Sequence, residues 1–465
     1  MNEQNIVYPY IPNSVPAVKK EMLETIGVSS VEALFEDIPQ HLRIKGKMDL
    51  PEPIHDEYSL MRHVKNLLSK NSNTSENLNF LGAGCYEHAV PAVCDEINGR
   101  AEFLTAYAGQ TYSDHGKFQA MFEFNSLMTE LLDMDFLALP QYDGPAAAAS
   151  ALRMAARLTG RREVLLPRSI NPETLSLIKN YVHSVTDPIN VVLVNIDGES
   201  GTLDMEDLKS KVSDNTAAIY IENPGYLGTF EPKAEEIGNI AKDKGAEYVV
   251  YCDPISLGIV APPSHYGATI ACGDLQALGM HMTCGGAQAG FIAGGDAERA
   301  AQLKDVMIGI ADTQKQGEYG FAMAGVFNTS YFAREDCDEY TGSGTALWCI
   351  TAGVYLALMG PKGMEEVGQS IVQKARYAAD RISELEGVTV TFNSPFFKEF
   401  VVNFDGTGKS VEDINQALLG QNIFGGKDLS AELPELGQSA LYCVTETKTQ
   451  QDIDVLIDAL KAVTQ

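Results

Sequence analysis

Short apolar segments alternate with helical segments through the middle of this chain, between about residues 115 and 295. We expect strands at residues 164–166, 191–194, 217–221, 248–251, 269–271 and 290–293, and helices at 117–134, 144–158, 172–181, 203–212 and 234–244. Near-continuous apolar strands separated by helices are typical of a mostly parallel sheet with helices on both faces. The pattern therefore predicts a large α/β domain.

The two ends of the chain follow other patterns. The first hundred residues read as loops and helices, with one helix expected at 59–70. After residue 345, a long helical segment precedes expected strands at 388–392, 400–404 and 441–444 and helices at 411–419 and 451–463. We predict a helical N-terminal arm (1–100), a large α/β domain (101–330) and a small C-terminal α+β domain (331–465).

Charge and composition exclude several classes of partner. The formal net charge of −29 would repel nucleic acid and anionic membranes. No apolar stretch approaches the ~20 residues of a membrane span, and the first ten residues do not resemble a signal peptide. The eight cysteines are scattered, without clustered metal ligands, which favours free thiols. We expect a cytoplasmic protein without a metal site.

Two positions carry groups that suit a ligand crevice. Asp143-Gly144-Pro145 opens an expected helix, whose free first-turn amides could bind an anion, although an ordinary helix start fits equally well. Asp253 follows the strand at 248–251, where a carboxylate would point into a crevice; a turn-capping role fits as well.

This outline suggests the fold type I architecture of pyridoxal-phosphate enzymes, in which a helix start holds the phosphate and an Asp pairs with the pyridinium nitrogen. Such enzymes hold the cofactor through a lysine, expected a few tens of residues after Asp253. The chain has no lysine from Gly245 through Leu303. We therefore expect that no primary amine of this chain reaches the cofactor aldehyde, and that any chemistry needs a partner.

Ordered motifs along nearly the whole chain resemble one family, the lysine-less alpha subunit of the two-chain glycine decarboxylase. The motifs are Tyr10-Ile11-Pro12-Asn13, Glu21-Met22-Leu23-Glu24, Ile26-Gly27-Val28-Ser29-Ser30, Leu34-Phe35-Glu36-Asp37-Ile38-Pro39, Phe80-Leu81-Gly82-Ala83-Gly84-Cys85-Tyr86-Glu87-His88, Glu102-Phe103-Leu104-Thr105-Ala106-Tyr107, Phe122-Glu123-Phe124, Tyr142-Asp143-Gly144, Asp253-Pro254-Ile255-Ser256-Leu257-Gly258, Gly273-Asp274-Leu275-Gln276-Ala277-Leu278-Gly279 and Gly285-Gly286. The resemblance implies a fold of the type I pyridoxal-phosphate-dependent transferases, with a seven-stranded, mostly parallel sheet.

The resemblance also implies a function and partners. The family decarboxylates glycine and transfers the aminomethyl group to a lipoylated carrier, the H-protein. Gln276 would stand where the homologous beta subunit has its lysine, so pyridoxal phosphate would sit on that partner and not covalently on this chain. Gly144 and Asp253 would then line a vestigial crevice, and the chain alone would be inactive.

Two segments differ from the family pattern. The segment at residues 108–116 lacks the usual glutamate and prolines, and the segment at 334–340 is more acidic than usual. Candidates that could reach the shared site are Tyr107, Tyr112, Asp114 and His115, although Asp114 and His115 could simply cap the next helix. Two alternatives stay open: a diverged scaffold or regulatory subunit, and a subunit of a pyridoxal enzyme for another amino acid.

Overall fold

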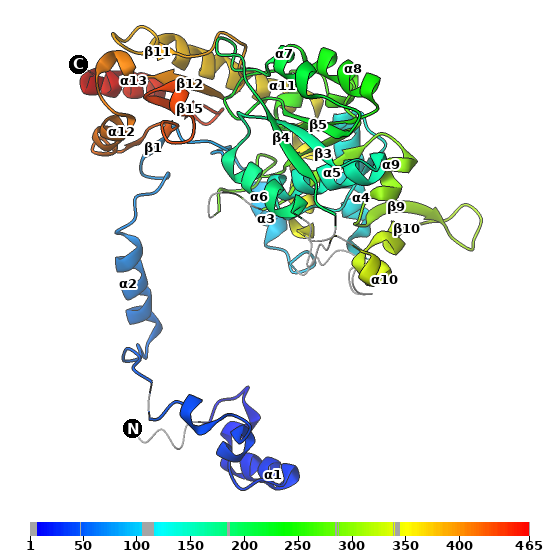
Figure 1. The fold of residues 1–465 in the computed structure, drawn as a ribbon. Coiled ribbons are helices and arrows are strands. Elements are labelled where there is room, and N and C mark those ends of the chain that lie inside the picture. Colours follow the sequence, from blue (N-terminus) through cyan, green and yellow to red (C-terminus); the bar gives the residue numbers. More distant parts are fainter. Residues whose placement is uncertain are drawn as a thin grey trace. The chain divides into compact units, whose positions relative to one another are not determined.

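The computed structural model of this chain describes residues 7–46, 48–104, 116–183, 187–283, 286, 288–337, 339 and 345–464 (Figure 1). Two compact units make up the chain, residues 1–72 and 73–465. Among the described residues, no helix is both long and apolar enough to cross a membrane.

The first unit is a string of short helices without a core. It contains α1 (Pro16–Ile26), α2 (Glu57–Leu68) and three short 3-10 helices at Pro12–Ser14, Glu32–Phe35 and Gln40–Leu42. Helix α1 ends where Gly27 takes a left-handed conformation (φ 87°), and Asp56 caps α2 by accepting a hydrogen bond from the Ser59 amide. None of the described residues of this unit is buried.

A seven-stranded sheet organises the second unit. Its strands are, in order across the sheet, β2 (Phe136–Leu137), β8 (Gly290–Gly294), β7 (Ile270–Asp274), β6 (Glu247–Tyr251), β5 (Thr216–Glu222), β3 (Glu163–Pro167) and β4 (Asn190–Val194). The five strands from β7 to β4 run parallel, whereas β8 is antiparallel to β7 and β2 is antiparallel to β8. The predicted mostly parallel, seven-stranded sheet is confirmed.

Helices cover both faces of this sheet because neighbouring strand residues point to opposite sides. Leu166 and Tyr220 pack with helices α5 (Gly144–Thr159) and α6 (Pro172–Val182) on one face. Their neighbours Leu165 and Ile219 pack with α7 (Met205–Lys211) and α8 (Ala234–Lys244) on the other. Further along that face, Phe291 packs with α4 (Phe118–Leu132) and with α11 (Ala346–Ile382).

The C-terminal part forms a second, smaller sheet. Helix α11 is interrupted at Gly360 (φ 58°), just before Pro361, and leads into the antiparallel sheet. Its order is β11 (Thr389–Val390), β12 (Glu399–Asn403), β15 (Ser439–Cys443) and β14 (Lys427–Asp428), with α12 (Val411–Leu419) and α13 (Gln450–Thr464) sharing its core. Strand β1 (Leu78–Asn79) pairs with β13 (Ile423–Phe424). The expected elements are present, and the boundary at residue 331 stays a prediction.

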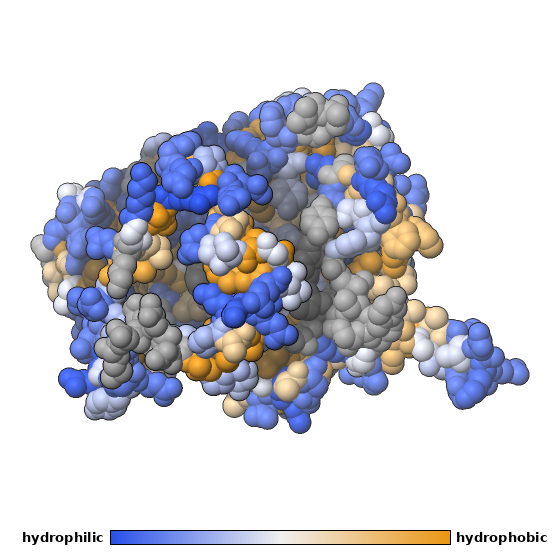
Figure 2. Space-filling model, turned by 90° about the horizontal axis from the view of Figure 1, so that it is seen from below, coloured by the Kyte–Doolittle hydropathy of each residue, from blue (hydrophilic) through white to orange (hydrophobic). Residues whose placement is uncertain are grey.

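One supersecondary element was not predicted. Strands β9 (Met307–Asp312) and β10 (Tyr319–Ala324) form a hairpin that projects from the surface with a hydrophilic tip (Figure 2). Small residues at Gly309, Ala311, Gly320 and Ala322 blur the alternation that would reveal its strands. The remaining helices are short: α3 (Ala92–Asn98), α9 (Ala297–Gln302) and α10 (Ser330–Ala333).

Candidate functional site

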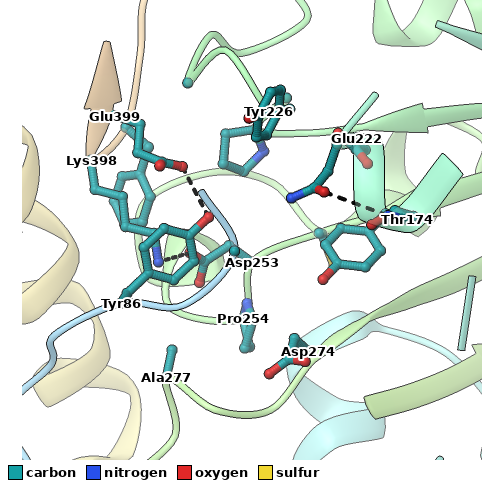
Figure 3. A pocket seen from close by; sticks show the side chains of 18 of the residues that line it. Tyr86, Thr174, Glu222, Tyr226, Asp253, Pro254, Asp274, Ala277, Lys398 and Glu399 are labelled. Atoms are coloured by element: carbon teal, nitrogen blue, oxygen red, sulfur yellow. Dashed lines mark hydrogen bonds and ion pairs between the residues drawn. The ribbon is translucent and has the colours of Figure 1, made fainter. Parts of the chain in front are cut away.

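A cavity lies at the carboxyl ends of the parallel strands (Figure 3). Glu222 ends β5, Asp253 follows β6 and Asp274 ends β7, and all three line the cavity. The opposite wall comes from the loop around Tyr86 and from the start of β12. Ligand crevices of open α/β sheets form at this edge, so the cavity is where the crevice was expected.

The cavity is rich in buried carboxyl groups. Burial raises the pKa of Glu222 and of Glu399 to about 7, and that of Asp274 to about 6. Hydrogen bonds limit these shifts: Glu399 accepts from the Ala83 amide at 2.6 Å and from the Tyr86 hydroxyl at 2.9 Å. Such an acidic lining disfavours a strongly anionic ligand.

A buried lysine enters the same cavity from the C-terminal sheet. The Lys398 ammonium lies 2.5 Å from Oδ2 of Asp253 and 3.3 Å from the centre of the Tyr86 ring. His88 Nε2 lies 3.2 Å from the same ammonium, and its Nδ1 lies 2.9 Å from Glu446. The crevice therefore holds one primary amine, which comes from outside the segment that follows Asp253 and is ion-paired with Asp253. The expectation that no amine of this chain reaches a cofactor aldehyde stays a prediction.

The sequence does contain a signal that could have revealed this lysine. Lys398 and Glu399 are charged, yet they interrupt an otherwise apolar segment that includes Phe397 and Phe400. Charged residues in a buried strand are rare unless they are paired. Type I enzymes place their cofactor lysine within a few tens of residues after the strand-end Asp, and Lys398 lies far beyond that region.

Gln276 occupies the position at which the catalytic homologue was expected to carry its lysine. Its side chain is 1% exposed. The amide nitrogen donates to the carbonyl oxygens of Tyr86 (3.0 Å) and Met280 (2.9 Å), and the amide oxygen accepts from the Tyr86 N–H (3.1 Å). Gln276 therefore fixes the loop that forms one wall of the cavity.

The helix start that was expected to hold an anion already holds carboxylates. Asp274 Oδ2 accepts from the Gly144 N–H at 2.9 Å, and Asp143 Oδ1 accepts from the Ala146 N–H at 2.6 Å. A Cβ added at Gly144 would lie 2.3 Å from the Tyr251 hydroxyl oxygen, so only glycine fits there. The first turn of α5 is thus capped from within the chain.

The other candidate residues come from the two segments that differ from the family pattern, at 108–116 and after 334, and from the preceding Tyr107. Tyr107, Tyr112, Asp114 and His115 lie outside the described residues, so their proposed roles stay predictions. Glu339, in the acidic segment after residue 334, lies 2.7 Å from Arg153 and 2.9 Å from Arg157 of α5. The guanidinium groups of Arg153 and Arg157 therefore neutralise the negative charge of Glu339.

The crevice does not fit pyridoxal phosphate as its residues stand. The phosphate position at α5 is capped by Asp274, and the carboxylate that would pair with a pyridinium nitrogen is paired with Lys398. Gln276 offers no amine for a covalent link. A cofactor entering here would have to displace both of these internal contacts.

Sequence comparisons match the chain over nearly its full length. The profile of the family described as "Glycine cleavage system P-protein" matches residues 9–460. A probable glycine dehydrogenase (decarboxylating) subunit 1 from Staphylothermus marinus is 37% identical over 464 residues, covering 97% of each protein. A probable subunit 1 from Carboxydothermus hydrogenoformans is 38% identical over 453 residues, covering 97% of this chain and 98% of that protein.

Solved structures agree with this result. The crystal structure of a glycine decarboxylase (P-protein) of the glycine cleavage system, in inhibitor-bound form, matches with a TM-score of 0.86 and 29% identity over 98% of this chain and 100% of that one. A sphingosine-1-phosphate lyase of Burkholderia pseudomallei, 16% identical, shares the fold with a TM-score of 0.66 over 91% of this chain and 94% of that one. The predicted fold of type I pyridoxal-phosphate-dependent transferases is confirmed, and the chain belongs to the glycine cleavage system P-protein family.

Proposed function

We propose that this chain is the supporting subunit of a glycine decarboxylase, the subunit without the lysine that binds the cofactor. A homologous beta subunit would hold pyridoxal phosphate, which supplies the electron sink for loss of the glycine carboxyl group. A lipoylated carrier protein would receive the aminomethyl group. The observation that carries the proposal is Gln276, which stands in a P-protein fold at the expected lysine position and is held by backbone hydrogen bonds.

The naming of the relatives supports a second chain, because each is called subunit 1 of a glycine dehydrogenase. In this scheme the chain's own residues do not perform the bond-breaking chemistry. They shape the wall of a shared site and provide the surface on which the partner docks. Tyr107, Tyr112, Asp114 and His115 remain our candidates for reaching that shared site.

The first unit supplies apolar surface for such docking. Leu60, Met61, Leu67 and Leu68 on α2 are each 47–60% exposed. Helices with an apolar face are stable in water when that face is covered, and large exposed apolar patches mark protein interfaces. We infer that the partner subunit covers this face of α2.

We also propose the cytoplasm as the compartment. The seven described cysteines are all free thiols, and five of them are buried. Free thiols are typical of proteins in a reducing environment.

The test is reconstitution with the homologous lysine-bearing chain and a lipoylated carrier. Exchange of labelled bicarbonate into the carboxyl group of glycine is expected from the pair and from neither chain alone. Exchange with another amino acid but not with glycine would refute the proposed substrate. Equal exchange by the partner alone would refute the need for this chain.

A pair of variants on α2 tests the docking surface. Met61→Glu places a charge on the apolar face and should abolish co-purification with the partner, together with exchange. Asn66→Glu, on the polar face of the same helix, adds the same charge and should leave both unchanged. Loss of association in both variants, or in neither, would contradict the assignment.

A further inference from the structure

In a catalytic crevice of this fold, a bound pyridoxal phosphate would pair with the strand-end carboxylate and with the amides at the helix start. In this cavity, side chains of the chain itself make both contacts. Its cationic side is the Lys398 ammonium, which lies beside Asp253. Its anionic side is the Asp274 carboxylate, which lies on the first amide of α5. Both groups line the same cavity: Lys398 directly precedes β12, and Asp274 ends β7.

We propose that Lys398 and Asp274 are built-in substitutes for the coenzyme, the ammonium replacing its pyridinium N–H and the carboxylate replacing its phosphate. The inference concerns this chain alone, so it does not depend on the partner's substrate. Its consequence is that the chain excludes pyridoxal phosphate even as a non-covalent ligand. It would therefore not compete with a catalytic partner for the coenzyme.

The ion pair between Lys398 and Asp253 is buried, so breaking it would change the stability of the chain. The side chain of Lys398 is 3% exposed and that of Asp253 is 11% exposed. Removing one member of a buried ion pair leaves an uncompensated charge, which is much less favourable than removing both. The Tyr86 ring and His88 further confine the ammonium, since they lie 3.3 Å and 3.2 Å from it.

The same contacts join separate parts of the second unit. Lys398 belongs to the segment that enters the C-terminal sheet, whereas Asp253 follows β6 of the large sheet. Asp274 joins the end of β7 to the start of α5. The chain makes both connections itself, so the crevice keeps its shape without a ligand.

The first test is a charge-pair cycle on the full-length chain. Lys398→Met should lower the midpoint of thermal unfolding by roughly 3–6 °C, because Asp253 is left buried and unpaired. Lys398→Met combined with Asp253→Asn removes both charges and should recover most of that loss. If the double variant is no more stable than Lys398→Met, the ammonium does not act through Asp253 and the proposal is overturned.

The second test uses pyridoxal phosphate as the probe in equilibrium dialysis. The wild-type chain should show no saturable binding. Lys398→Ala combined with Asp274→Ala frees both positions and should bind the probe at least tenfold more tightly than either single variant does. Saturable binding by the wild type, or no binding by a double variant whose circular dichroism is native, would overturn the proposal.

A matched control separates this effect from general loosening. Lys448 is also a buried lysine, 6% exposed, and its ammonium lies 2.7 Å from Glu87 outside the cavity lining. Lys448→Ala should destabilise the chain without creating binding of pyridoxal phosphate. Binding by this variant equal to that of the double variant would show that loosening alone admits the probe, and would also overturn the proposal.

Discussion

Replacement of Gln276 by leucine removes the amide that stands at the expected lysine position while keeping a side chain of similar volume. Three hydrogen bonds are lost, those to the N–H and the carbonyl of Tyr86 and that to the carbonyl of Met280. Because Gln276 is 1% exposed, water cannot easily replace them. The backbone groups of the cavity loop are then left without their partner.

The expected loss follows from these three contacts. A buried polar group without a partner costs roughly 1–3 kcal/mol, and the apolar leucine offsets part of the total. We expect Gln276→Leu to lower the free energy of unfolding by about 3–5 kcal/mol. The chain has one tryptophan, Trp348, which packs against the core that contains Met280 and Leu278. Its fluorescence in a urea titration reports the loss directly.

Gln288 provides a matched control. Its side chain is also buried, 6% exposed, but among the described residues neither atom of its amide has a hydrogen-bond partner. Gln288→Leu removes unpaired polar atoms, so it should leave stability unchanged or raise it by about 1 kcal/mol. Equal losses for the two variants, or a loss below about 0.5 kcal/mol for Gln276→Leu, would refute the role given to the Gln276 hydrogen bonds.

Three further predictions concern charge and space around the cavity. Burial would raise the pKa of Glu446, but the hydrogen bond and charge of His88 outweigh it and lower this pKa from 4.5 to about 2. Above pH 4.5 the wild type should therefore exceed Glu446→Gln in stability by roughly 3 kcal/mol. In urea titrations this advantage should vanish as the pH falls from 4.5 towards 2. Burial raises the pKa of Glu222 from 4.5 to about 7, so the wild type should lose stability as the pH rises across that range, and Glu222→Gln should lose less. Gly144→Ala would place a Cβ 2.9 Å from the Cβ of Asp274, so this variant should have a lower melting temperature than the wild type. A Cβ at Gly309 meets no atom within 4 Å, so Gly309→Ala should keep the melting temperature of the wild type.

The large sheet was predictable because its strands are short, apolar and separated by helices of ordinary length. Each expected strand from 164–166 to 290–293 overlaps an observed one. Strand β2, which has two residues, and the hairpin β9–β10 were missed. Two residues give no period to detect, and the small residues of the hairpin hide its alternation.

The site was only partly predictable, since sequence order does not show which distant segments share a cavity. Asp253 and Gly144 could be placed because strand ends and helix starts of a parallel sheet meet at one edge. Lys398 could not be placed in this way, because it directly precedes β12 of the antiparallel C-terminal sheet. The partner of a strand-end carboxylate can thus come from any element that folds over that edge.

The loss of a lysine from a coenzyme crevice does not by itself leave a stable protein. Without the coenzyme, Asp253 would be a buried anion with no cation, and the first amide of α5 would lack an acceptor. In this chain Lys398 supplies the cation and Asp274 supplies the acceptor, while Gln276 holds the cavity wall through hydrogen bonds to the Tyr86 backbone. Because each of the three contacts replaces a different missing interaction, reintroducing a lysine at position 276 alone should not restore coenzyme binding. The other two contacts would still exclude the ring and the phosphate, so Gln276→Lys should give no borohydride-stable adduct unless Lys398 and Asp274 are also replaced.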